Sequence, residues 1–164
     1  MNIIELEDNV RAWVQRVLPG KPVGFAYTDF NRPKSSYVLL NLYTQVPLGT
    51  EGREYSPQPD RMVRVTTSSA RKVHISVQVF YAGSVQFADQ LTESLRQISN
   101  QEHFSQLGLG FTKTTDIKKV PVVINKKWEE RAVFDIEFFA RSEYFEDVET
   151  IESVELNSTT YPNP

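Results

Sequence analysis

The sequence predicts an α+β domain in which a mostly antiparallel sheet of about five strands has two helices packed on one face, with a long loop and a C-terminal arm. Three observations predict it: two segments with helical apolar spacing, several segments in which apolar and polar residues alternate, and breaks rich in proline and glycine. Because the chain has 164 residues, 40% of them apolar, we expect a single domain over residues 1–156 and a flexible tail over 157–164.

Two helices are expected from amphipathic spacing. The first covers residues 4–18 and ends at Pro19-Gly20, and the second follows the turn at residues 82–84, with Ser84 as its N-cap. Their apolar stripes would face the sheet. The stripes are Leu6, Val10, Trp13, Val14 and Val17 in the first helix, and Phe87, Ala88, Leu91, Leu95 and Ile98 in the second.

Strands are expected over residues 23–28, 36–46, 61–67, 72–81 and 131–140. In the last two, every second residue is apolar, which is the period of a strand with one buried face. That face should form the core with the helices. The predicted core consists of Val38, Leu40, Leu42, Val73, Ile75, Val77, Val79, Phe134, Ile136 and Phe138, against Val10, Trp13, Val17, Leu91 and Leu95.

Two segments lack a clear period. Residues 47–60, "PLGTEGREYSPQPD", contain three prolines and two glycines, which predict a protruding loop. Residues 99–127 mix a helical turn, a glycine-rich break and a short apolar run, so we expect irregular structure there.

The second face of the sheet is semi-polar. It is too apolar to be fully solvated and too polar for a core, which is typical of a contact with a subunit or partner. An ordinary solvent face with scattered aromatic residues is the alternative. The apolar members of this face are Tyr37, Leu39, Tyr43, Phe80, Val133 and Phe139.

Candidate chemistry is sparse. The chain has no cysteine, and its two histidines, His74 and His103, are not in metal-binding spacing. Asp135 and Glu137 share a strand face and could form an acid/base pair or hold a divalent ion, but surface carboxylates are the interpretation we favour. We therefore expect no catalytic residue, no cofactor and no metal.

The net charge and the length of the apolar runs argue against two further kinds of protein, those that coat nucleic acid and those that cross a membrane. A net charge of −3 argues against a protein that coats nucleic acid, which usually presents a strongly basic face. No segment has the roughly 20 consecutive apolar residues that cross a bilayer, and the N-terminus lacks an export signal, so we expect a soluble protein with no membrane contact.

Three stretches, in order, resemble the neck and tail terminator-like family of tailed bacteriophages and prophages. They are "NRPKSSYVLLNLYTQVPLG", "VHISVQVFYAGSVQFADQLTESL" and "WEERAVFDIEFFARSEYFEDVETIESVEL". The family pattern is matched by Pro33, Tyr37 and Val38, by Ser76, Val77, Gln78, Ala88 and Leu91, by Trp128, Glu130, Arg131 and Ala132, and by Ile151 and Val154.

The resemblance implies a virion structural protein without catalysis. Such a protein is made in the host cytoplasm and forms a ring, a hexamer, in the virion neck. The ring would close the upper end of the tail tube and join it to the head-completion or connector proteins, with DNA only passing through its channel. The alternatives are another neck or tail subunit, a nucleic-acid-binding module, or a small enzyme using His74, Asp135 and Glu137.

A ring subunit needs contact residues, and the sequence suggests several. A bore that lets DNA pass should be acidic or neutral, so Asp135 and Glu137 are expected to line it or to pair with a neighbouring subunit's lysines. Arg131, on the same strand face, is expected in a subunit contact or channel wall. The acidic stretch 143–155 is expected to be a second strand or an arm. The full set of predicted subunit or channel contacts is Tyr37, Tyr43, Arg131, Asp135, Glu137, Phe139, Ile151 and Val154.

Overall fold

A computed structural model describes residues 3–26, 28–59 and 62–149, and this part contains three helices and eight strands. The α+β class and the mostly antiparallel sheet are confirmed. No helix in the described ranges is long and apolar enough to cross a membrane. The elements are α1 Ile3–Val17, β1 Val23–Phe25, β2 Tyr37–Gln58, β3 Met62–Phe80, α2 Ser84–Arg96, α3 Ile98–Gln106, β4 Leu109–Thr114, β5 Lys118–Lys119, β6 Val122–Ile124, β7 Lys127–Glu129 and β8 Arg131–Glu149.

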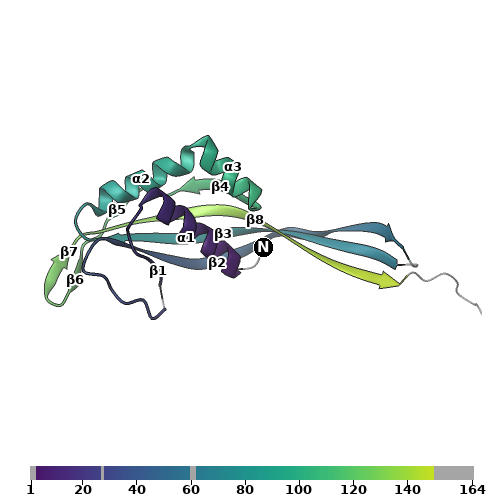
Figure 1. Cartoon of the computed structure of the whole chain (residues 1–164), viewed down its shortest axis with the longest axis horizontal. Helices are drawn as coiled ribbons and strands as arrows, with labels where there is room; N and C mark the ends of the chain where they lie inside the picture. Colours follow the sequence, from purple (N-terminus) through teal and green to yellow (C-terminus); the bar gives the residue numbers. More distant parts are fainter. Residues whose placement is uncertain (1–2, 27, 60–61, 150–164) are drawn as a thin grey trace, which may run out of the picture.

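The main sheet has six strands in the order β1-β2-β3-β8-β4, and β5 pairs with β8 outside this path (Figure 1). Within the described chain, β1 and β2 are the parallel pair and all other neighbours are antiparallel. Strands β6 and β7 form a separate two-stranded hairpin. The long strands β2, β3 and β8 lie side by side and set the shape of the molecule.

The core joins the helices to one set of alternating strand residues. Trp13 of α1 donates a hydrogen bond from Nε1 to Ser94 Oγ of α2 at 3.1 Å, and its ring packs edge-on against Phe104 of α3. Phe104 in turn contacts Phe138 of β8, with ring centroids 5.1 Å apart. Every predicted core residue is confirmed, with Leu42 and Val17 at the margin of the cluster.

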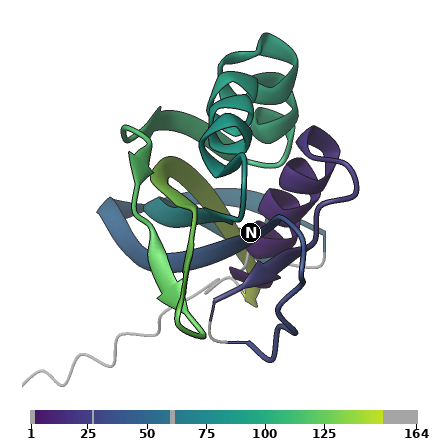
Figure 2. The same cartoon turned by 90° about the vertical axis from the view of Figure 1, so that its left-hand side faces the viewer.

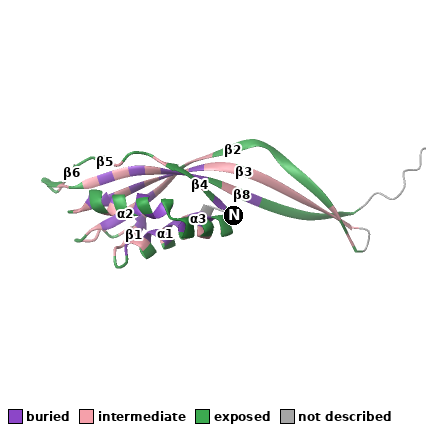
Figure 3. Cartoon of the chain, turned by 90° about the horizontal axis from the view of Figure 1, so that it is seen from above, coloured by how far each residue is buried: buried purple, intermediate pink, exposed green. Residues whose placement is uncertain are grey.

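Beyond the helices, the three long strands continue as an arm, which we define as residues 47–58, 62–71 and 141–149. Figure 3 shows that burial is concentrated beside the helices and that the arm is intermediate or exposed. Ser142 is the one buried residue among those described in the arm, and its hydroxyl lies 2.7 Å from Ser69 Oγ across the ladder. Backbone pairing, rather than a core, therefore holds the arm together.

The predicted loop over residues 47–60 is wrong, because β2 runs through it to Gln58. Prolines are tolerated here since β2 is an edge strand along the arm, where a missing N–H need not remove a ladder hydrogen bond. The glycines accompany a register shift between Leu48 and Gly52, where Gly49 has φ of 70°. The strands expected at 61–67 and 72–81 are one strand, β3, which completes the hairpin.

The expectation of irregular structure over residues 99–127 was also wrong for much of this segment, which contains a helix and several strands. Helix α3 covers Ile98–Gln106, but it buries only Phe104 and Asn100, so its sequence has no apolar stripe. Strand β4 follows after Gly108, at φ of 72°. At α2 the N-cap is Gly83 rather than Ser84, whose buried hydroxyl has no hydrogen-bond partner among the described residues.

Candidate assembly surfaces

The face of the sheet opposite the core cluster, which we call the open face, is covered at one end by the chain itself. Tyr37 is only 3% exposed because its ring stacks on Phe80 with centroids 4.7 Å apart. Phe30 and Tyr81 pack around the same ring, at 5.8 and 6.0 Å. Burial raises the pKa of Tyr37, and the charge of Arg32 opposes the rise. Tyr37 is thus inside the subunit, where it supports the open face by packing.

Arg131 also lies at this covered end. Its guanidinium stands 6.0 Å from the Phe80 ring centroid, and Nε donates a hydrogen bond to the Val120 carbonyl oxygen at 3.1 Å. Nη1 reaches Gln78 Oε1 at 3.5 Å. These contacts fasten the segment after β5 to the sheet.

Glu137 lies further along the open face, at the centre of a group of basic side chains. Its carboxylate is buried, yet Oε1 is 3.4 Å from Lys72 Nζ, and Oε2 is 3.7 Å from His74 Nε2 and 3.8 Å from Lys113 Nζ. The register explains the arrangement, because Glu137 stands opposite His74 of β3 and Lys113 of β4. Glu137 is therefore paired with cations of its own chain.

A pocket of about 240 Å³ adjoins this group and contains Tyr43, Asp135 and Thr115 in its lining. Tyr43 lies beside His74, with ring centroids 5.8 Å apart, and partial burial raises its pKa, with the charges of Asp135 and Glu137 adding to the rise. The pocket brings His74, Asp135 and Glu137 together, but no cluster of three histidine or acidic side chains suited to a metal occurs in the described ranges.

Phe139 remains accessible on the open face. Its side chain is exposed where β8 leaves the helices, and Lys72 Nζ lies 5.8 Å from its ring centroid. Ile151 and Val154, the other apolar residues predicted to contact a neighbour, lie outside the described residues.

The arm has one apolar face. Successive strand residues point to opposite faces, so Val63 and Val65 share the face of the core residue Val73. Tyr55 is paired with Val65, and Tyr144 with Thr67, so both rings lie on that face. We define the apolar arm face as Tyr55, Pro57, Val63, Val65, Tyr144 and Val148.

This apolar face is unusually open. Tyr55 and Tyr144 are 63% and 58% exposed, and Val148 is exposed beside them. No described residue covers this patch, and contiguous exposed apolar patches commonly mark a contact with another molecule. This face was not predicted from the sequence, because Tyr55 and Pro57 fall in the segment expected to be a loop, although the tyrosine and the alternating valines were the available signal.

The opposite face of the arm is more polar. Arg64 donates from Nε and Nη2 to the two carboxylate oxygens of Asp147, at 2.7 and 2.8 Å, and its guanidinium stands 5.2 Å from the Phe145 ring centroid. The pair lowers the pKa of Asp147 and raises that of Arg64. Such a bidentate pair fixes the pairing of β3 with β8 near the tip.

At the other end of the molecule, the β6–β7 hairpin presents a second exposed apolar pair. Val123 and Trp128 are opposite each other in the ladder and are 52% and 75% exposed. Figures 1 and 2 show the hairpin projecting away from the helices. Its base is held by an ion pair between Arg32 and Glu129. An exposed tryptophan on an anchored hairpin is typical of a protein contact.

An elongated sheet whose described residues include exposed aromatic side chains at both ends is typical of a protein that contacts other chains. The chain belongs to the phage neck terminator protein family, which it matches over residues 5–163. Its fold is also similar to the sheath/tube terminator of an extracellular contractile injection system, PVC, determined by cryo-EM in the extended state.

That structural match has a TM-score of 0.53 at 11% sequence identity. It covers all of this chain and 65% of the other, so the chain spans about two thirds of the length of the protein it matches. No curated protein sequence matches the chain.

Proposed function

We propose that this chain is a virion structural protein, without catalytic activity, that assembles into a closed hexameric ring at the upper end of a phage tail tube. The ring would end the tube and join it to the head-completion or connector proteins of the neck. The observation that supports this most directly is the projecting arm with its uncovered apolar face, in a chain of the neck terminator family.

Ring closure requires two unlike surfaces on each subunit, because head-to-tail contacts join different patches. The apolar arm face and the β6–β7 hairpin are two such surfaces, and they lie at opposite ends of the molecule's long axis. Beyond its covered end, the open face is available for a third contact or for the channel wall. Of the predicted contact residues on this face, Tyr43, Asp135 and Phe139 are the exposed or half-buried ones that would take part.

The channel is proposed to pass DNA without holding it. The carboxylate of Asp135 makes no ion pair within the described ranges, so it can keep a bore surface acidic, whereas Glu137 is neutralised by its own lysines. Tyr37 and Arg131 would shape this surface from inside the subunit. Ile151 and Val154 are proposed to contact a neighbouring subunit.

The proposal is tested by electron microscopy of the purified protein mixed with the cognate tail-tube protein. A terminator adds one ring at one tube end, and tube length then stops increasing. A protein that forms long tubes by itself would instead be a tube subunit, and one that leaves tube growth unchanged would not be a terminator.

A further inference from the structure

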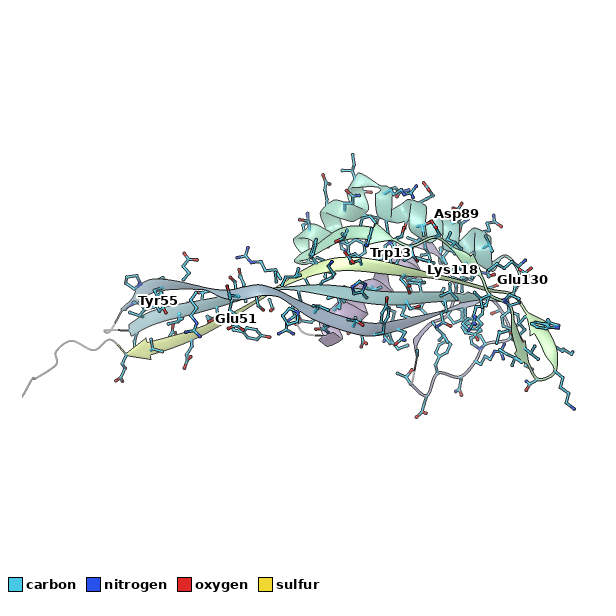
Figure 4. All side chains as sticks on the ribbon, turned by 180° about the vertical axis from the view of Figure 1, so that it is seen from behind. Trp13, Glu51, Tyr55, Asp89, Lys118 and Glu130 are labelled. Atoms are coloured by element: carbon cyan, nitrogen blue, oxygen red, sulfur yellow. The ribbon has the colours of Figure 1, made fainter. Side chains whose placement is uncertain are left out.

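The two uncovered apolar surfaces are at opposite ends of the long axis. Figure 4 shows Tyr55 and Glu51 on the arm at one end, and Lys118 and Glu130 near the hairpin at the other. Neither surface can therefore cover the other within one chain. Among the described residues nothing covers either surface, and two copies of the chain could each supply the surface that the other lacks.

The two ends also differ in the sign of their unpaired charges. On the arm, four carboxylates have no ion-pair partner among the described residues, and they outnumber the two described arginines without one, Arg53 and Arg71. These carboxylates are Glu51, Glu54, Glu146 and Glu149. Around the hairpin, Lys119 forms an ion pair with Glu130. The ammonium groups of Lys118, Lys126 and Lys127 have no ion-pair partner in the described chain.

The hairpin is held in a fixed conformation. Its turn residues Asn125 and Lys126 have φ of 49° and 63°, as in the tight two-residue turns that match the twist of paired strands. Glu130 accepts hydrogen bonds from Lys119 Nζ and from the Gly83 backbone N–H, at 3.1 and 3.3 Å. Trp128 is therefore presented on a short, fixed element, which reduces the conformational entropy lost on binding.

We propose that the β6–β7 hairpin of one copy docks on the apolar arm face of the next copy, with Trp128 and Val123 against Tyr55 and Tyr144. Lys126, in the hairpin turn, then lies near Glu146, which is paired with Val65 and shares the apolar arm face. Lys127 and Glu149 point to the opposite sides of their strands and add to the charge at the two ends of the contact. This inference rests on the proposed ring, for which it names the contact between neighbouring subunits. Complementary charge sets the direction of the contact, and the aromatic residues supply most of its strength.

Thiol cross-linking tests the contact directly, since the chain has no cysteine and each variant would have a single thiol. Arg53→Cys, made with a size tag, places a thiol on the arm beside Tyr55, and Lys127→Cys places one on the hairpin. The two are mixed and treated with a short flexible thiol cross-linker, both free and in the presence of tail-tube protein. Asp89→Cys, at an exposed position of α2, replaces Lys127→Cys in the control mixture.

The expected product is a cross-linked heterodimer, formed several-fold more than in the control mixture. Arm-to-arm products from Arg53→Cys alone at equal yield, or heterodimer no greater than with Asp89→Cys in both conditions, would overturn the proposal. Heterodimer without tube capping would leave the contact standing and reject the terminator function. Capping without heterodimer would do the reverse.

A charge exchange gives a second readout on the full chain. Lys126→Glu with Lys127→Glu should weaken self-association, and so should Glu146→Lys with Glu149→Lys in separate chains. Mixing the two variants should restore association between them, because opposite charges meet again. Trp128→Ala should weaken association by at least roughly tenfold. Equal association of the like-charged and the exchanged pairs would contradict the contact.

Discussion

His74 on β3 and Glu137 on β8 are register partners, with Nε2 of the histidine 3.7 Å from Oε2 of the glutamate. Lys72 and Lys113 approach the same carboxylate, so one buried anion holds together cations from β3 and β4. The most polar part of the open face is thus a structural ion-pair network that joins three strands just before the arm begins.

Replacing Glu137 by glutamine should therefore lower the stability of the fold. Lys72 and Lys113 would lose their common counter-ion and His74 its carboxylate neighbour, and because Lys113 is largely exposed we expect a loss of about 1–3 kcal/mol in the free energy of unfolding. Urea denaturation monitored by tryptophan fluorescence measures it. Glu146→Gln, at an exposed and unpaired carboxylate, is the matched control and should change stability by less than about 0.5 kcal/mol. Equal effects of the two variants would mean that the network contributes nothing.

Tyr37 should make the protein sensitive to alkali. Burial raises the pKa of Tyr37 above its ordinary value of 10.0, so the folded chain holds the phenol proton more tightly than the unfolded chain. The associated stability is complete below the unfolded pKa and is lost as the pH rises through the folded pKa. Tyr37→Phe keeps the ring stacked on Phe80 and removes the titration. The stability of the wild type should fall relative to Tyr37→Phe above pH 10, and parallel curves would show that the phenol is not the cause.

Gly24 should resist substitution. A Cβ at this position would lie 2.3 Å from the ring of Phe30, which packs on Tyr37. Gly24→Ala must displace that ring and should destabilise the fold by about 1–3 kcal/mol, as overpacking does. Gly110→Ala is the control, since its Cβ would meet Phe139 at an ordinary 3.8 Å. Thermal unfolding compares the two, and an unaffected Gly24→Ala protein would show that Phe30 moves at no cost.

The two faces of the arm should differ in function. Tyr55→Ser with Tyr144→Ser removes exposed rings from the apolar arm face, so stability should change by less than about 0.5 kcal/mol while tube capping is lost. Phe145→Ser removes a ring that is 73% exposed on the opposite face and should leave capping intact. Electron microscopy of tubes grown with each variant gives the answer. Loss of capping in Phe145→Ser alone would assign the contact to the other face.

Much of the part of the fold that contains the core, meaning the helices and the strand segments packed against them, was predictable from the sequence. The two-residue period of β3 and β8 and the helical spacing of α1 and α2 placed the core, because each local pattern agreed with the tertiary packing. The arm was not predictable, since Pro47, Pro57 and two glycines indicate a turn unless one knows that β2 lies at the edge of the sheet. Edge position is a property of the topology, which no local pattern contains.

The site was predicted less completely than the fold. Alternation placed His74, Asp135 and Glu137 on the open face, but the ion-pair network depends on the register between β3, β4 and β8. Tyr37 was expected on a contact surface because it alternates with the core residue Val38, but the segment containing Phe30 packs over it within the subunit. Trp128 was noticed as part of a family pattern, whereas its 75% exposure follows only from the short β6–β7 hairpin.

The central claim is that copies of this chain close into one ring at the end of a tail tube. Cryo-EM of tube ends, after tube protein is grown in the presence of this chain, measures it most directly. We expect a single layer of six copies at one end of each tube, with each arm in contact with the neighbouring copy. Copies bound singly along the tube wall, or stacked in many layers as a continuing helix, would contradict it.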